Sequence, residues 1–131
     1  MVNCRILPDE SVDEVQKTLV RVLADSKIDI TSDGQPVLSP TPPLTPQIMR
    51  PAAAITEAMW PGVPLVPMLL AAATDGRFLN NAGIPTYGIS GIFRDEDAGR
   101  VHGQNERIRV KSLDEGREFL YRLVKAMASD Q

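Results

Sequence analysis

The residues best suited to chemistry lie within residues 71–106. His102 is the only histidine of the chain, and it opens the short polar run HGQNE at residues 102–106. An imidazole can bind a metal ion or carry a proton near neutral pH. Upstream, residues 74–77 read TDGR and combine a hydroxyl, a carboxylate and a guanidinium around one glycine. Because α/β sheets place their sites in short polar turns at strand ends, we expect these two turns to face one site.

A complete metal site is not expected from His102 alone. A zinc ion takes three or four ligands. The chain has one histidine and one cysteine, and neither a His-x-x-x-His motif nor a Glu-Glu pair accompanies His102. A lone histidine is more often an ordinary surface or core residue. The glycine-bearing loop before it and the polar residues after it favour the ligand interpretation.

Two further features have both a structural and a functional interpretation. In the upstream turn, Asp75 can cap a short helix while Arg77 pairs with a nearby carboxylate. Alternatively, the hydroxyl of Thr74 and the amides around Asp75 and Gly76 face a substrate, and both interpretations can hold together. Arg5 is either a solvent-facing strand residue or a fork that grips a substrate carboxylate through two hydrogen bonds.

Composition excludes several classes of function. With 131 residues, 43% hydrophobic and 24% charged, the chain has the size and composition of one globular domain with a real core. The net charge is −3 with both signs dispersed, and no basic run with interleaved aromatic residues occurs. A nucleic-acid interface is therefore not expected.

Membrane and secretory features are also not expected. The longest apolar run, residues 65–73, is interrupted by Pro67 and is too short to span a bilayer. The N-terminal residues lack a signal-peptide pattern. The single cysteine, Cys4, excludes an internal disulfide and fits a reducing compartment, so a cytoplasmic location is predicted. Cys4 lies in an alternating apolar run and is expected to be a buried, inert thiol.

Helix signals divide the chain clearly. The sequence predicts a helix over residues 12–25 after a capping box at Ser11. A second helix starts at Pro46, with Thr45 as its cap, and is ended by residues 60–62. Pro51 allows a kink or a restart within that second helix. A third, short helix over 76–81 ends in a left-handed Gly83, and a second capping box at Ser112 introduces the fourth, over 113–128.

The intervening segments predict strands and one linker. Alternating or continuous apolar patterns indicate strands at residues 2–7, 28–31, 65–70 and 84–90, and a brief extended piece at 107–110. Residues 33–44 are rich in proline, so neither a helix nor a central strand is expected there, and they form a linker. Helices that alternate with strands predict an α/β fold with parallel pairing.

Five motifs in this order resemble one enzyme family. They are residues 3–8 (NCRILP), 73–77 (ATDGR), 82–88 (AGIPTYG), 102–108 (HGQNERI) and 115–120 (EGREFL). The chain resembles the C-terminal third of the di-zinc exopeptidases and deacylases, which include carboxypeptidase G, succinyl-diaminopimelate desuccinylase, aminoacylase and carnosinase-like dipeptidases. Single motifs are weak, but their order and spacing are specific, and the resemblance covers nearly the whole chain.

The resemblance implies an architecture. In that family, a phosphorylase/hydrolase-like α/β catalytic domain is interrupted by a smaller ferredoxin-like lid domain that usually forms the dimer. Residues 1–32 would then be a strand-helix-strand remnant of the lid. Residues 33–44 would be the proline-rich hinge, and residues 45–131 the C-terminal part of the catalytic domain. A homodimer through the lid half is implied.

The resemblance also implies roles for individual residues. His102 matches the family's last zinc ligand, and Arg5 matches the lid arginine that holds a substrate carboxylate. Thr74, Asp75 and Gly76 match the turn that lines the substrate site. The family's other zinc ligands and its glutamate general base have no counterpart in this sequence.

These matches imply a function and leave alternatives. The family uses two zinc ions and a glutamate base to attack an amide carbonyl. The leading hypothesis is a fragment of a zinc-dependent metallopeptidase or amidohydrolase that acts on small peptides or N-acyl amino acids and is inactive alone. The main alternative is a non-enzymatic truncated module that self-associates or pairs with a partner through its lid half. A weaker alternative is a regulatory domain in which Arg5 grips a ligand carboxylate.

Overall fold

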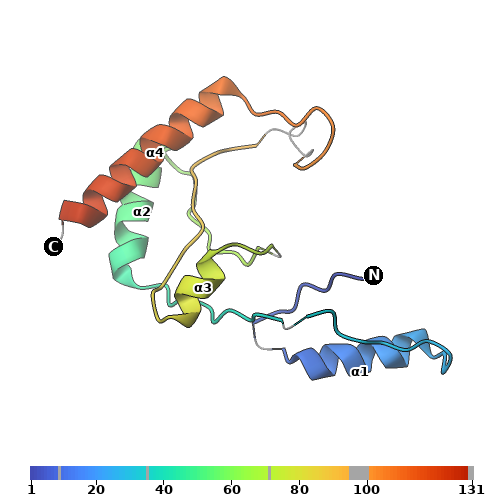
Figure 1. Ribbon diagram of the computed structural model, residues 1–131. Coiled ribbons are helices and arrows are strands. Elements are labelled where there is room, and N and C mark those ends of the chain that lie inside the picture. Colours follow the sequence, from blue (N-terminus) through green and yellow to red (C-terminus); the bar gives the residue numbers. More distant parts are fainter. Residues whose placement is uncertain (9, 35, 71, 95–100, 130–131) are drawn as a thin grey trace. The chain divides into compact units, whose positions relative to one another are not determined.

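The computed structural model describes residues 1–8, 10–34, 36–70, 72–94 and 101–129 (Figure 1). Over these ranges the chain forms four helices in the order α1 (Val12–Leu23), α2 (Pro46–Met59), α3 (Gly76–Asn81) and α4 (Val110–Ser129). The chain divides into two compact units. The first unit contains Met1–Pro43 and Leu69–Tyr87, and the second contains Leu44–Met68 and Gly88–Gln131. The predicted domain boundaries at residues 32 and 44 stay a prediction.

The strands expected from the sequence are absent from the described residues, so the α/β class is not confirmed. The predicted strand at 107–110 instead runs into the start of α4 at Val110. A strand is stabilised by hydrogen bonds to a neighbouring strand, and an isolated segment has no such partner. The apolar side chains of the predicted strands are accordingly exposed, including Val2, Val66 and Leu70.

Helix α1 begins where the sequence predicts and ends two residues early. The hydroxyl of Ser11 accepts a hydrogen bond from the Glu14 amide at 3.1 Å. The other half of the predicted capping box does not form, because the Glu14 carboxylate pairs with Lys17 at 2.7 Å. Ala24 takes a left-handed conformation with φ of 49° and stops the helix before Asp25. None of the residues of α1 is fully buried, and its apolar face is only half covered, at Val12, Val15 and Leu19.

Helices α2 and α4 form the core of the second unit and lie against each other (Figure 1). Ala52, Phe119 and Leu123 are almost fully buried, with 1%, 2% and 4% of their surface exposed. A surrounding layer of half-buried side chains packs on them: Ile55, Met59, Trp60, Leu65 and Ile89. This small cluster is the hydrophobic core among the described residues.

Proline and threonine shape α2. Thr45 and Pro46 occupy the cap and first position as predicted, although the Thr45 hydroxyl makes no capping bond. Pro51 lies inside the helix and does not end it, since one continuous helix runs to Met59. Proline removes one amide donor without preventing the later bonds of the helix. Further along, the buried Thr56 hydroxyl donates to the Ala52 carbonyl at 2.7 Å.

Residues 88–93 pack against α4 and Trp60. The Trp60 ring meets Phe93 edge to face at a centroid distance of 4.8 Å and Phe119 at 5.7 Å. A Cβ atom at Gly91 would lie 2.7 Å from Phe119 Cβ, so only glycine permits this approach. Gly91 also has φ of 62°, which favours glycine independently.

The predicted cap of the fourth helix is wrong. Helix α4 begins at Val110, three residues before the expected start at Leu113. Ser112 therefore lies within the helix, and it is buried rather than positioned to cap. The backbone bond from the Leu113 amide to the Arg109 carbonyl, 3.1 Å, shows that the helical turn is already formed there.

Among the described residues, none of the helices combines the length and the apolar character that a membrane span requires.

Candidate functional site

The turn before α3 has the predicted position but a different capping hydrogen bond. The Thr74 hydroxyl accepts a hydrogen bond from the Gly76 amide at 3.2 Å. Asp75 has helical backbone angles, φ −65° and ψ −16°, and its side chain makes no capping bond. Asp75 therefore occupies the cap position as predicted, but the side-chain hydrogen bond at the start of α3 comes from Thr74 instead. This leaves the exposed Asp75 carboxylate outside the capping interaction.

Gly76 is required by close packing rather than by its backbone angles. A Cβ atom there would lie 3.0 Å from Thr86 Cγ2 and 3.1 Å from Thr74 Oγ1. Both distances are shorter than ordinary contacts between nonbonded heavy atoms. The turn at residues 74–76 is thus held against Thr86, at the start of the segment that follows α3. Gly83 ends α3 with φ of 80°, as the sequence predicts.

The surroundings of Arg77 differ from those that the sequence predicts. Its guanidinium lies 4.7 Å from the centre of the Phe78 ring, a cation–π contact. Its Nε atom is buried and has no hydrogen-bond partner among the described residues. The ion pair with a carboxylate that the sequence predicted is not found in those ranges, and the buried Nε is not accessible to a ligand.

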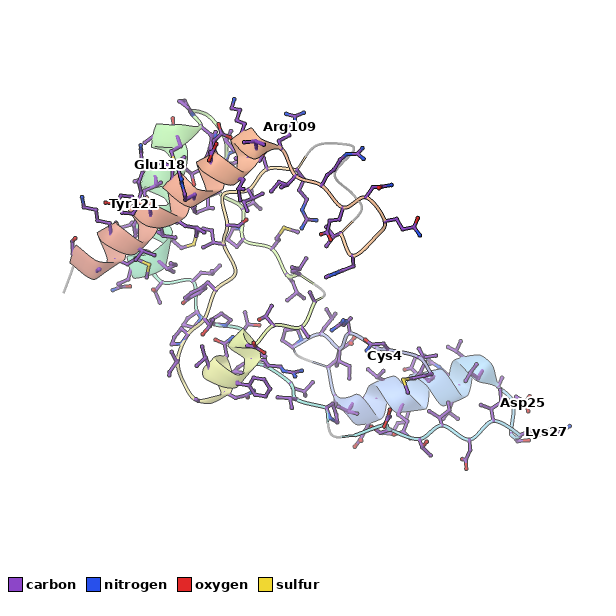
Figure 2. All side chains as sticks on the ribbon, turned by 45° about the horizontal axis from the view of Figure 1, so that its top comes forward. Cys4, Asp25, Lys27, Arg109, Glu118 and Tyr121 are labelled. Atoms are coloured by element: carbon purple, nitrogen blue, oxygen red, sulfur yellow. The ribbon has the colours of Figure 1, made fainter. Side chains whose placement is uncertain are left out.

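Arg5 lies in the N-terminal segment of the first unit, the unit that also contains the turn at residues 74–76. Arg5 is exposed, which suits a residue that meets a ligand. The neighbouring Cys4 is an exposed free thiol (Figure 2), so the prediction of a buried cysteine is wrong. The alternating pattern anticipated a sheet that would cover Cys4, and the described residues provide none.

His102 lies in the second unit, in an exposed loop before α4. Its backbone is left-handed with φ of 63°, and Asn105 follows with φ of 59°. Positive φ is uncommon for residues other than glycine, although histidine and asparagine adopt it more readily than most. The side chain of His102 is exposed to solvent. Its role as a ligand stays a prediction.

The described residues do not fit a complete metal site. No three histidine, cysteine, aspartate or glutamate side chains in these ranges come together where a metal ion could bind. His102 belongs to the second unit, whereas Asp75 belongs to the first. The prediction that the two turns face one site therefore stays a prediction, and we derive no catalytic step through a metal ion from these residues.

Comparison with known proteins identifies the class of this chain. Residues 4–126 match the description "Peptidase family M20/M25/M40". The chain therefore belongs to this peptidase family, which confirms the resemblance seen in the motifs. Members of the family are generally metal-dependent. No solved structure matches the chain.

Three curated proteins are similar over nearly the whole chain. The N-fatty-acyl-amino acid synthase/hydrolase PM20D1 of Homo sapiens is 29% identical over 137 residues, which cover 99% of this chain and 27% of that protein. The Xenopus tropicalis protein of the same name is 26% identical, over 98% and 26%. The probable carboxypeptidase S-like 2 of Dictyostelium discoideum is 24% identical, over 95% and 24%. The chain spans about a quarter of the length of these relatives.

Proposed function

We propose that this chain is the His102-bearing portion of a zinc-dependent hydrolase that cleaves the amide bond of small peptides or N-acyl amino acids. The observation that carries the proposal is the family match over residues 4–126. The relatives point the same way, since one is an N-fatty-acyl-amino acid synthase/hydrolase and another a probable carboxypeptidase S-like protein. Both kinds of substrate carry a free carboxylate beside an amide bond.

In this proposal each of the candidate site residues has its own role. His102 offers one imidazole nitrogen as a ligand, and two zinc ions would complete their coordination with side chains outside the described residues. Arg5 grips the substrate carboxylate, and the turn of Thr74, Asp75 and Gly76 lines the substrate. Guanidinium groups suit carboxylates because they offer paired donors in one plane.

We propose that the missing strands form only with further partner segments. Residues 65–70 carry four side chains that are more than half exposed, namely Val66, Met68, Leu69 and Leu70. Such a continuous apolar run is typical of a parallel strand that is buried on both faces. The α/β catalytic domain and the lid at residues 1–32 would then be completed outside this chain. A cytoplasmic location remains part of the same prediction.

The first experiment tests whether the chain acts alone. We expect the purified 131-residue chain, with added zinc or cobalt, to hydrolyse neither dipeptides nor N-acyl amino acids. One ligand and no placed base leave nothing to activate water. Turnover that disappears in His102→Ala and persists in the neighbouring Gln104→Ala would show that the site is complete, and the prediction that the chain is inactive alone would be wrong.

A second experiment tests whether this chain supports hydrolysis within a complete protein. The matching quarter of the Homo sapiens relative is replaced by this chain, and hydrolysis of N-acyl amino acids is measured. We expect activity that His102→Ala abolishes and Gln104→Ala leaves unchanged. A chimera that is folded, as judged by cooperative unfolding, yet equally active with and without His102 would contradict the role of this residue.

The partly exposed apolar face of helix α1 favours the alternative of a non-enzymatic module. On this face Val22 and Leu23 are 72% and 48% exposed, whereas Val12, Val15 and Leu19 are half-buried. An apolar face of this kind suits self-association or a partner chain through residues 1–32. Light scattering after size exclusion distinguishes the cases. A monomer at all concentrations removes the support for this alternative.

A further inference from the structure

We propose that Asn80, Asn81 and Tyr87 form a clasp that fixes the proline-rich segment to α3, and that this clasp holds the turn at residues 74–76 in place. The three side chains all reach residues 38–43, about 40 positions earlier in the sequence. All the residues involved belong to the first unit. The clasp makes Asn80, Asn81 and Tyr87 positioning residues rather than ligands.

Asn81 supplies the tightest connection of the clasp. Its side-chain amide donates to the Leu38 carbonyl at 2.7 Å and to the Arg77 carbonyl at 2.8 Å. One amide group therefore joins the proline-rich segment to a backbone carbonyl of α3 itself. Because both acceptors are backbone carbonyls, the contact fixes the path of the chain whatever side chains the segment carries.

Asn80 connects a second pair of segments. Its side-chain nitrogen donates to Ser39 Oγ at 3.3 Å, while its side-chain oxygen accepts from the Thr86 amide at 2.7 Å. Thr86 in turn packs on Gly76, with its Cγ2 atom 3.0 Å from where a Cβ would stand. A continuous path thus runs from Ser39 through Asn80 and Thr86 to the turn.

Tyr87 closes the clasp at the limit of the first unit. Its hydroxyl donates to the Pro43 carbonyl. Pro43 and Tyr87 are the last residues of the two sequence ranges that form this unit. The hydroxyl therefore ties together two of the points at which the chain leaves the unit. Figure 1 shows the segment that contains Pro43 passing α3 within this unit.

The composition of the clasped segment explains why few bonds suffice. Pro36, Pro40, Pro42 and Pro43 restrict the backbone angles but provide no amide donors. Such a segment is stiff, and it cannot anchor itself through a ladder of backbone bonds. The two asparagines and the tyrosine supply donors from outside, and each added bond positions several residues at once. We therefore expect residues 38–43 to keep one path, so that the chain can change direction only before or after them.

The clasp can affect the position of the turn at residues 74–76 because α3 is short. The helix has only six residues, with the turn at its first end and both asparagines at its last. A displacement of the proline-rich segment is therefore transmitted to the turn. The description of this turn as a substrate surface rests on the function proposed above, whereas the clasp itself does not.

The test is NMR relaxation of backbone amides in the full 131-residue chain without substrate. In the wild type we expect order parameters for Leu38 and Gly76 near the rigid value of about 0.85. In Asn81→Ala both should fall below about 0.6, the flexible range. Asn81→Asp, which keeps the shape but loses the donor, should give the same result. Asn105→Ala removes an exposed asparagine outside the clasp and should change neither amide.

Each other outcome overturns part of the inference. If Leu38 stays rigid in Asn81→Ala, there is no clasp. If Leu38 loosens and Gly76 does not, the segment is clasped but the turn is not coupled to it. If the amides of α1, which belongs to the same unit, loosen as well, the first unit has unfolded. Tyr87→Phe, which removes one hydroxyl, then decides by the same readout at Thr41. None of these results depends on substrate, so the proposed hydrolase function is tested separately.

Discussion

Gly116 offers a sharp test of how the loop containing His102 is anchored. His102 lies between residues 88–94 and α4 in the sequence, so the contact between those two segments fixes the chain on both sides of it. Gly116 lies buried in α4 at that contact. In an open helix, replacing glycine with alanine stabilises by about 1 kcal/mol. Here we expect Gly116→Ala to destabilise instead.

The magnitude follows from the distances at Gly116. A Cβ atom there would lie 2.5 Å from Ile92 Cγ1 and 3.1 Å from the Ser90 carbonyl oxygen. Carbon atoms pack at about 3.5–4.0 Å, so residues 90–92 must move away from the helix. Overpacking of this kind costs about 1–3 kcal/mol, which outweighs the gain in helix propensity. The net loss is expected to be about 1 kcal/mol.

A second substitution separates the two contributions. Ile92→Ala removes the Cγ1 and Cδ1 atoms that the new methyl group would meet. In that background, Gly116→Ala should become neutral or stabilising by up to about 1 kcal/mol, because mainly the helix term remains. The coupling energy between the two positions is therefore expected to be about 1–2 kcal/mol.

Trp60 makes the measurement direct. It is the only tryptophan of the chain and lies 5.7 Å from the Phe119 ring in the same core. Urea unfolding followed by its fluorescence reports the stability of the second unit. Gly62→Ala is the matched control, since Gly62 has φ of 78° but nothing within 4 Å of its Cβ position. It should be destabilising through backbone strain, and Ile92→Ala should not change that effect.

The result that refutes this reasoning is simple to recognise. If Gly116→Ala stabilises the unit by about 1 kcal/mol both with and without Ile92, there is no close contact at this position. Residues 90–92 would then not lie on α4, and the loop containing His102 would be anchored in some other way.

Three further outcomes are expected. Phe119→Ala should lower the stability reported by Trp60 fluorescence by about 3–5 kcal/mol, because a side chain that is 2% exposed leaves a cavity; a loss below about 1 kcal/mol would mean that this core is absent. His102→Ala should change the unfolding free energy by less than about 0.5 kcal/mol in the same assay, since the side chain is exposed; a larger loss would give His102 a structural role. Thr74→Ala should cost about 1 kcal/mol through the lost cap whereas Asp75→Ala costs less, measured by hydrogen exchange of α3 amides, and the reverse order would return the cap to Asp75.

The sequence predicted the helices well because their stabilising contacts are local. Ser11 and Pro46 mark helix starts at the observed positions, and Gly83 marks the end of α3. Each signal depends on residues within a few positions of itself. Where the prediction failed, at Ser112, the helix begins at Val110 and the residue expected to cap it is buried within it.

The candidate site was predictable only in part. The order of the motifs pointed to the family, and residues 4–126 match it. The roles of His102, Arg5 and the turn at residues 74–76 rest on that resemblance and stay predictions. That Arg77 lacks a carboxylate partner among the described residues was not anticipated, because this depends on which side chains surround it in the folded chain.

The sequence by itself determined the starts of α1 and α2, the glycine turn after α3 and the family, since these depend on residue order and local hydrogen bonds. Only the tertiary structure decided that Cys4 is exposed, that Ser112 is buried within α4, and that Asn80 and Asn81 bind the proline-rich segment. The reason is physical. Strands, clasps and binding sites are made by segments far apart in the chain, and residue patterns specify what such a segment can bury but not which partner it meets.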